Sequence, residues 1–519
     1  MIAPKRIDIT PKQLEELLAR AKKLLPKEDY ETIKGMADTI SFLSNAVNSK
    51  SASIQRLLAM LFGTITEKTA KVLREKKAIE SDKKKKCRGH GKNGAISYSG
   101  AEKIKISHQS LKPKDRCPAC KKGKVYDMPS PSLIVRISAQ APLSAKVYEL
   151  QKLRCNLCGQ VFTAAAPEGL GDEKYDSASG AMIALLKYGS GLPFNRLDNL
   201  QESLGIPLPA STQWEIVQSV ADKIQHAYRE LIRKAAQGDV IHNDDTVMKI
   251  LDQINLSDEE KQGRTGMFTS GFMSIAGDTR IALFLTGHNH AGENMADILA
   301  KRSNTLGPPI QMCDGLSRNI PKNFKTILAN CLAHGRRKFV EINTSFPKEC
   351  EYVLKTLEKV YENDAYTKKK NMSPEQRLKY HQENSAKLME DLKNWLSSQM
   401  EDKKTEPNSG LGQAISYMLK HFKELTLFLR EPKAPLDNNI CEQALKKVIL
   451  HRKNSLFYKT EHGAYIGDLF MSLIHTCNLC KANPFEYLKT LQQYSPLIAK
   501  NPEKWMPWNF QEMICSEAE

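Results

Sequence analysis

The chain has 519 residues, of which 41% are hydrophobic and 26% are charged. This is ordinary for a folded soluble protein of roughly three or four domains. The N-terminal segment lacks the apolar core of a signal peptide, and no apolar run approaches the length of a membrane span. We therefore expect an intracellular protein whose 12 cysteines are reduced, where paired cysteines indicate metal more often than disulfide.

The net charge is strongly positive, because 77 Lys and Arg residues stand against 59 Asp and Glu residues and give a formal charge of +18. An excess of this size favours a polyanionic partner, with nucleic acid first and an anionic membrane surface second. The alternative is a merely basic soluble protein without such a partner.

Residues 10–80 have a helical pattern with a seven-residue apolar repeat. The a positions are Ile33, Ile40, Val47, Ile54 and Leu61, and the d positions are Met36, Leu43, Lys50 and Leu57. This mix favours a two-stranded parallel coiled coil. The alternative is a helix packed on its own domain, because Gly35 and the Asn and Ser residues near 44–53 disfavour a long helix.

Two Cys-x-x-Cys pairs follow a lysine-rich run that we interpret as a solvated linker able to contact phosphates. The pairs are Cys117 with Cys120 and Cys155 with Cys158. Two such turns complete a closed tetrahedral zinc site, so we predict one structural Zn²⁺. The alternative is that one of the pairs is incidental.

The rest of the chain alternates between helical and strand patterns. Residues 176–235 are predicted to be helical, and Ser211 and Thr212 are predicted to cap the helix that follows "GIPLP". Five strands are predicted, in order, at "DVIHNDD", "GMFTSGFMSIAG", "RIALFLTG", "PPIQMCD" and "KTILANC". With a helix at "AGENMADILAKR", they suggest a mixed sheet with helices on its faces. Residues 345–430 read as a helical insertion, and another helix is predicted to start near Asn439.

Three carboxylates stand where these elements end or begin. Asp244 closes the first predicted strand, Asp314 closes the fourth, and Glu442 lies early in the helix after the insertion. Carboxylate oxygens are the ligands that Mg²⁺ prefers, and pairs of such ions catalyse in-line phosphoryl displacement. The alternatives are that Asp244 and Asp314 are turn acids, and that Glu442 forms a capping box with Asn439.

Several segments together resemble the IS66 family of bacterial insertion-sequence transposases. In the C-terminal half they are "VIHNDDT", "MCDG", "NCLAHGRRKF", "LDNNICEQALKKVILHRKNSLFY" and "GAYIGDLFMSLIHTCNLCKANPFEYL". In the N-terminal half they are "LLAMLFGTITEK", "GHGKNGAISYSGAEKIKISHQSL" with both Cys-x-x-Cys pairs, and "KYGSGLPFNRLDNLQESLGIPLPASTQWEIV". The resemblance covers most of the chain.

The resemblance implies an RNase H-like core whose DDE triad is Asp244, Asp314 and Glu442, holding two Mg²⁺ or Mn²⁺ ions. The family usually has Glu after the first Asp, where this chain has Asp245. Strand alternation points these neighbours to opposite sides, so that only one can face the site.

A Cys-x-x-His pair after the second acid, Cys331 and His334, would support the site. Its alternative is a strand-end cysteine beside a helix-cap histidine. Basic residues nearby would face DNA phosphates or, alternatively, form solvated surfaces. They are Arg336, Arg337 and Lys338, and the segment from Lys446 to Lys453 with Arg452.

The sequence therefore predicts an α/β multidomain protein with an RNase H-like mixed-sheet core, a helical insertion, a zinc-ribbon-like module and an N-terminal helical region. The predicted divisions are 1–85 (helical, coiled coil), 86–170 (zinc module), 171–236 (helical, DNA-binding), 237–344 and 431–465 (catalytic core), 345–430 (insertion) and 466–519 (helical).

The predicted function is transposition. The protein would bind terminal inverted repeats, cut the DNA and join its 3′-hydroxyl to a target. The expected partners are double-stranded DNA, further copies of the chain as a dimer or higher assembly, and small accessory proteins of the same element, without a membrane. The expected location is the bacterial cytoplasm, at the nucleoid. The alternatives are an RNase H-like nuclease without strand transfer and a decayed transposase that only binds DNA.

Overall fold

The computed structural model describes most of the chain after residue 172 and parts of the chain before it. The described residues are 11–24, 26, 28–37, 69–73, 104, 106–107, 110–128, 141–154, 156, 158, 160–168, 173–254, 264 and 266–517. The chain divides into two compact units, one formed by residues 79–144 and one by residues 1–78 with 145–519.

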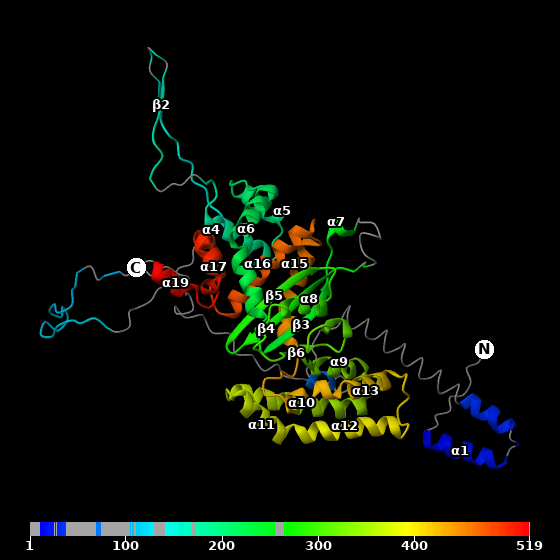
Figure 1. Cartoon of the computed structure of the whole chain (residues 1–519). Coiled ribbons are helices and arrows are strands. Elements are labelled where there is room, and N and C mark those ends of the chain that lie inside the picture. Colours follow the sequence, from blue (N-terminus) through cyan, green and yellow to red (C-terminus); the bar gives the residue numbers. More distant parts are fainter. Residues whose placement is uncertain are drawn as a thin grey trace, which may run out of the picture. The chain divides into compact units, whose positions relative to one another are not determined.

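The larger unit is built around a five-stranded mixed sheet (Figure 1). Its strands are β3 (Val240–Val247), β4 (Phe268–Ala276), β5 (Thr279–Gly287), β6 (Ile310–Cys313) and β7 (Ile327–Asn330), in the spatial order β5-β4-β3-β6-β7. β4 is antiparallel to β3 and β5, whereas β6 is parallel to β3 and to β7. The five predicted strands and the mixed character of the sheet are confirmed.

The central strand β3 is longer than the sequence predicted. Its expected end was Asp245, but the strand continues to Val247 because its last residues still pair with β4. On its other side, pairing with β6 stops at His242. Asp244 therefore lies inside the strand, just beyond the point where β3 loses one of its two neighbours.

Several helices of the described part of the chain contact the sheet, and four of them pack on β3, β4 or β5. They are α6 (Ala210–Ala235), α8 (Ala291–Leu299), α15 (Asn439–Ser455) and α16 (Glu461–Leu479). α15 packs on β3 and β4, α8 contacts the same two strands, and α16 runs along β5. The helices predicted after the third strand and near Asn439 are confirmed.

The outer edge of β5 is closed by side chains of α16. Three polar residues, one helical turn apart, accept hydrogen bonds from backbone N–H groups of the strand. The pairs are Asp468 with Thr286 (2.6 Å), Ser472 with Phe284 (2.9 Å) and Thr476 with Ala282 (3.1 Å). An edge strand exposes such unpaired groups unless another element covers them, so this polar stripe replaces a sixth strand.

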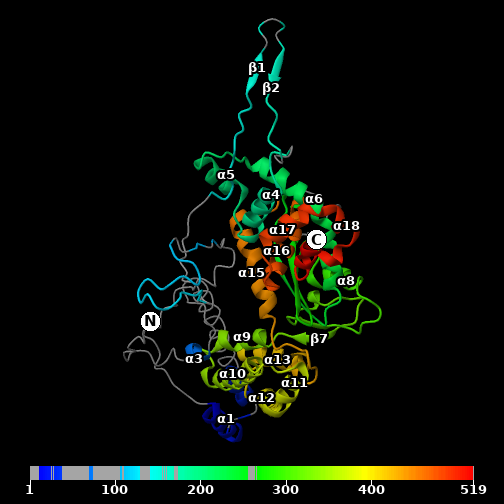
Figure 2. The ribbon, with the colours of Figure 1, turned by 90° about the vertical axis from the view of Figure 1, so that its left-hand side faces the viewer.

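Residues 345–430 form a helical layer, as the sequence predicted (Figure 2). Its helices are α10 (Pro347–Lys369), α11 (Pro374–Asn384), α12 (Ala386–Glu401), α13 (Gly410–Lys420), α14 (Phe422–Leu425) and the 3₁₀ turn Leu427–Leu429, with α9 (Leu332–Ile342) before them. Apolar side chains of this layer share one core with β6, β7 and α9. The insertion is thus anchored to the parallel side of the sheet.

The remaining described elements are mostly helical. They are α1 (Pro11–Leu24), a helix over residues 28–37, α3 (Thr69–Val72), α4 (Ser177–Ala184), the π-helix Leu185–Gly189, α5 (Phe194–Ser203), α7 (Leu251–Ile254), the 3₁₀ turns Ser317–Asn319 and Pro502–Trp505, α17 (Pro484–Gln493), α18 (Ser495–Lys500) and α19 (Phe510–Glu517). The strands β1 (Lys152–Arg154) and β2 (Val161–Thr163) form an antiparallel hairpin. Within the described part of the chain, no helix has the length and apolarity to cross a membrane.

Two predictions for the part of the chain before the sheet had different outcomes. The cap predicted for α6 is wrong, because Ser211 and Thr212 lie inside its first turn and Asp198 accepts the hydrogen bond of the N-terminal Ala210 N–H group (3.2 Å) instead. The heptad repeat lies mostly outside the described residues. Of its positions only Ile33 and Met36 are described, and both are exposed.

Candidate active site

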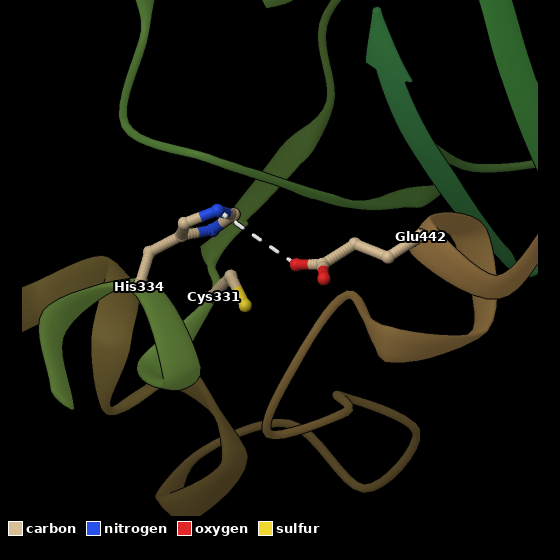
Figure 3. Close-up of side chains that lie close together, drawn as sticks. All are labelled: Cys331, His334 and Glu442. Carbon is tan, nitrogen blue, oxygen red and sulfur yellow. Dashed lines mark ion pairs between the residues drawn. The ribbon is translucent and has the colours of Figure 1, made fainter. Parts of the chain in front are cut away.

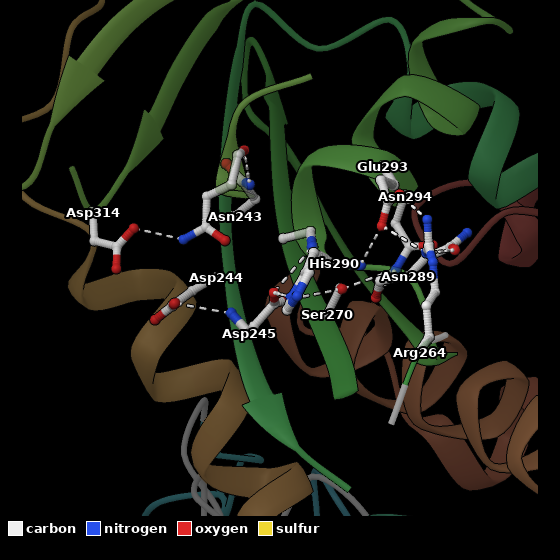
Figure 4. A network of polar contacts seen from close by, with 12 residues as sticks. Asn243, Asp244, Asp245, Arg264, Ser270, Asn289, His290, Glu293, Asn294 and Asp314 are labelled. Atoms are coloured by element: carbon white, nitrogen blue, oxygen red, sulfur yellow. Dashed lines mark hydrogen bonds and ion pairs between the residues drawn. The ribbon is translucent and has the colours of Figure 1, made fainter. Parts of the chain in front are cut away.

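The sheet register brings two of the predicted acids side by side. Met312 of β6 pairs with His242 of β3, and the two strands are parallel. Two residues further along lie Asp244, still within β3, and Asp314, just after the end of β6, so that the two are level on neighbouring chain segments. Figure 4 shows their carboxylates on the same side of β3.

The Asp244 carboxylate stands in an environment that disfavours its charge. Burial raises the pKa of Asp244 to about 7, and the charges of Asp314 and Glu442 contribute to this rise. The Asp245 backbone N–H donates a hydrogen bond to Asp244 Oδ1 (2.8 Å), which opposes the shift. A carboxylate that is desolvated and close to two others is what a bound divalent cation would neutralise.

Asp245 points away from this cluster and is fully engaged elsewhere (Figure 4). Its Oδ1 accepts a hydrogen bond from Ser270 Oγ (2.7 Å), and its Oδ2 contacts His290 Nδ1 and the Ala291 N–H, both at 3.1 Å. Only 1% of the Asp245 side chain is exposed. Asp245 thus holds the start of α8, and of the two adjacent acids it is Asp244 that faces Asp314.

Asp314 organises the turn that follows β6. Its Oδ1 accepts hydrogen bonds from the Leu316 N–H (3.2 Å) and from Asn319 Nδ2 (2.5 Å). The carbonyl oxygen of Asn319 in turn accepts from Asn243 Nδ2 (2.8 Å), beside Asp244 on β3. The turn role considered for Asp314 is therefore present, and the same contacts fix its carboxylate next to β3.

The helix that carries Glu442 is tied to the same strand. Asn438, just before α15, is buried; its Oδ1 contacts His242 Nδ1 (3.0 Å) and its Nδ2 donates to the Asn243 carbonyl (3.1 Å). Gly271 of β4 pairs with Asp244, and a Cβ built there would lie 2.8 Å from Leu445 of α15. The missing side chain lets α15 approach the sheet where the acids lie.

Glu442 does not form the capping box that was the alternative to a catalytic role, because Asn439 lies inside α15 and the N-cap residue Asn438 makes no side-chain cap hydrogen bond. Its carboxylate turns instead toward α9, where Oε1 lies 3.7 Å from His334 Nε2 and Oε2 lies 3.8 Å from Arg337 (Figure 3). Cys331 completes this group: one ligand atom each from Cys331, His334 and Glu442 lie within 4.8 Å of one another.

Among the described residues, Cys331, His334 and Glu442 are the three whose ligand atoms lie close enough to hold one metal ion together. Paired metal ions are themselves about 3.5–4 Å apart, so the ligands of two ions can be spread more widely than those of one.

More than half of the chain matches a known family. Residues 174–466 match the family model described as "Transposase IS66 family". The chain belongs to the IS66 transposase family.

Relatives of this family member occur in Sinorhizobium fredii. The uncharacterized protein y4jD is 33% identical over 35% of this chain and 36% of its own length. Two others, y4hP and y4qI, are each 25% identical, over 67% and 64% of this chain and 65% and 62% of their own lengths. The chain thus matches between about a third and two thirds of these relatives.

The basic residues that were predicted to contact DNA phosphates lie in different surroundings in this IS66 chain. Arg336 is buried and donates a hydrogen bond to Thr69 Oγ1 (3.2 Å), a placement that does not favour a phosphate contact. Arg337 lies beside Glu442, and Lys338 lies over the ring of Tyr417 with its Nζ 4.5 Å from the centroid.

On α15, the two lysines at the ends of the basic segment, Lys446 and Lys453, are exposed. Arg452 instead donates to Thr246 Oγ1 (3.2 Å) and ties the helix to the end of β3. The exposed cations of this segment are therefore the lysines, and Arg452 has a structural contact.

The predicted zinc ligands fall on different parts of the chain. Cys117 and Cys120 lie in the smaller unit, where the Cys117 N–H donates to the Gly123 carbonyl (2.8 Å) and the Gly123 N–H donates to Cys120 Sγ (3.4 Å). The hydrogen bond from the Gly123 N–H lowers the pKa of the Cys120 thiol, as suits a metal-binding turn. Cys158 belongs to the larger unit, and Cys155 lies outside the described residues.

Sequence reasoning missed several residues that position the acids. Asn438, Asn243 and Asn319 form buried hydrogen bonds around Asp244 and Asp314. A glycine inside the apolar strand "TSGFM" was a usable signal for the close approach of α15. The asparagines gave no such signal, because their partners are distant in sequence.

Proposed function

We propose that this protein is a DDE transposase with an RNase H-like core, which cuts DNA at the ends of an insertion sequence and joins the 3′-hydroxyl to target DNA. The observation that carries the proposal is the placement of Asp244 level with Asp314 by the β3–β6 register, with the Glu442 helix packed on the same strands. A sheet of three antiparallel strands continued by two parallel strands supports the proposed core.

The residues that would hold two Mg²⁺ or Mn²⁺ ions are Asp244, Asp314 and Glu442. When bound, the ions supply activation of the attacking oxygen and stabilisation of the leaving oxygen. The burial of Asp244, its raised pKa and the Glu442 Oε1 atom that is buried without a hydrogen-bond partner all fit a cation at this place. Asp245 would keep the geometry through its contacts with Ser270 and α8.

The proposed DNA contacts come from several regions. The zinc module, with Zn²⁺ held by the four cysteines, and the helical region before the core would bind the terminal inverted repeats. Exposed lysines such as Lys446 and Lys453 on α15 would face the phosphate backbone near the acids. Pairing of two DNA ends would require at least a dimer of the protein. Small accessory proteins of the same element would assist the reaction, which would take place at the bacterial nucleoid.

The test is a cleavage and joining assay on DNA that carries the inverted repeats flanking the gene. Wild-type protein with Mg²⁺ should nick these ends and transfer the 3′-hydroxyl, whereas Asp314→Asn and Glu442→Gln should bind the ends without nicking or joining. Nicking without joining would favour a nuclease. If Glu442→Gln cuts at the wild-type rate, the third acid lies elsewhere.

A further inference from the structure

We propose that Cys331, His334 and Glu442 form a binding site for a borderline transition-metal ion, Zn²⁺ above all, distinct from the Cys-x-x-Cys turns. One ligand atom of each side chain lies within 4.8 Å of the others (Figure 3). Two Zn–ligand bonds of about 2.0–2.1 Å at a tetrahedral angle place their ligand atoms about 3.3 Å apart. The observed 3.7 Å between His334 Nε2 and Glu442 Oε1 therefore needs only a small side-chain adjustment.

The backbone holds the three ligands in place before any ion binds. Cys331 is the residue before α9, and His334 is in the first turn of that helix, three residues later. This spacing puts both side chains at the same helix end. Glu442 comes from the first turn of α15, whose start is fixed to β3 through Asn438. The site thus joins the N-termini of two helices, α9 and α15.

An unsatisfied polar atom in this cluster favours an added ligand. Glu442 Oε1 is buried without a hydrogen-bond partner. Such atoms are rare in folded proteins and call for an explanation such as an ion. The Asn438 N–H donates to Cys331 Sγ (3.2 Å), which is the kind of contact that supports a metal-bound thiolate.

The ligand chemistry separates this site from the proposed magnesium site. A sulfur, an imidazole nitrogen and one carboxylate suit Zn²⁺ and other borderline metals, whereas Mg²⁺ takes oxygen ligands. Three protein ligands also leave a fourth position open. Arg337 contacts the other oxygen of Glu442, at 3.8 Å, so that Oε1 remains for the ion. The simpler reading is a metal-free His334–Glu442 ion pair.

One consequence rests on the proposed function. Glu442 is shared between this cluster and the DDE triad, so a Zn²⁺ ion on Cys331 and His334 would hold its carboxylate on the α9 side. Micromolar zinc should then inhibit the magnesium-dependent reaction. Bound zinc would thus inhibit DNA cleavage.

The primary test measures metal and not activity. Full-length protein is dialysed against micromolar Zn²⁺ in excess Mg²⁺, and bound zinc is determined by elemental analysis. Wild type should hold one more zinc per chain than Cys331→Ser, than His334→Gln and than Glu442→Gln, because each change removes one of only three protein ligands. Cys515→Ser, an exposed cysteine on α19, is the matched control and should equal wild type.

The variants share the four Cys-x-x-Cys residues, so that any zinc held there cancels in the comparison, and circular dichroism confirms that each variant is folded. Equal zinc content in wild type, Cys331→Ser and His334→Gln overturns the proposal. Failure of the proposed function appears separately, as absence of cleavage with Mg²⁺ alone. If cleavage occurs, zinc should inhibit wild type at least about tenfold more strongly than any Cys331→Ser activity that remains.

Discussion

Asp244 and Asp245 are adjacent carboxylates with opposite surroundings. Asp244 is half-buried beside two other acids with few compensating contacts, whereas Asp245 accepts from Ser270 and α8 and contacts His290. A functional site often keeps a charged group at a cost in stability, so removal of that charge often makes the protein more stable. The same isosteric change at the two positions should therefore have opposite effects on stability.

Asp244→Asn should stabilise the metal-free protein by about 1–3 kcal/mol at about pH 8 and much less at about pH 4. The folded pKa of Asp244, about 7, exceeds its unfolded value of about 3.9. Between these values the unfolded chain loses its proton first, so the wild type loses stability as pH rises from about 4 to about 7. Asp468, whose burial also raises its pKa to about 7, contributes equally to both proteins.

The control is Asp245→Asn, which places an amide N–H₂ opposite existing donors and should cost about 1–3 kcal/mol at either pH. Thermal melting in chelator, at both pH values, measures the differences. A stability of Asp244→Asn that equals wild type at the higher pH would show that the Asp244 carboxylate is well solvated or well paired.

At the scale of elements, the position of Glu442 depends on how closely α15 packs against β4. Gly271, paired with Asp244, faces Leu445 of that helix with no room for a Cβ. Gly271→Val should displace α15, destabilise the fold by about 1–3 kcal/mol and lower the rate of DNA cleavage beyond what the lost stability explains. Gly287→Val is the control, because nothing lies within 4 Å of a Cβ built at Gly287. Melting and cleavage at a temperature where both variants are folded give the comparison.

The elements themselves were largely predictable, because local patterns govern them. Alternation and turn signals located all five strands, and the charged helical pattern located the insertion. Tertiary contacts decided what sequence could not: Asp198 caps α6 in place of Ser211 and Thr212, and β4 extends β3 past Asp245. The polar residues of α16 that accept hydrogen bonds from β5 look like ordinary helix residues in the sequence, because the strand that they contact is distant along the chain.

The sequence predicted which residues form the candidate site, but it did not predict how their side chains are arranged. Asp244 and Asp314 became neighbours through a register between strands that are far apart in sequence. The choice between Asp244 and Asp245 needed the side-chain contacts of Asp245. The turn of Glu442 toward His334 and Arg337 had no counterpart in the sequence, since it depends on how two helices pack.

At the scale of the whole molecule, loss of zinc should affect the predicted zinc module and spare the sheet. Cys117→Ser should reduce bound zinc by one per chain and expose residues 86–165 to protease, since folding of a small metal-binding module depends on its metal. The melting of the five-stranded sheet and its helices should change little. Elemental analysis, limited proteolysis and calorimetry test this. Unchanged zinc content with normal protease resistance would mean that the cysteine pairs do not bind the ion.

The excess of positive charge predicts steep salt dependence of DNA binding, in proportion to the phosphates neutralised. Charge reversal of the run Lys83–Lys86, which lies outside the described residues, should weaken binding to all DNA sequences about equally and reduce the slope of log affinity against log salt. Fluorescence anisotropy with repeat and unrelated duplexes measures both. A changed preference among sequences would argue against simple contact between this run and the DNA backbone.

The helical insertion also determines how long after Asp314 the ribosome synthesises Glu442. It stands between Asp314 and Glu442 in sequence, although α15 packs directly on β3 and β4. The third acid leaves the ribosome about 130 residues after the second, a delay of roughly 10 s at bacterial synthesis rates. Until α15 docks, the face of the sheet at Gly271 is bare and the proposed triad is incomplete. A nascent chain, or one cut short within the insertion, should therefore be unable to cleave the DNA from which it is being expressed.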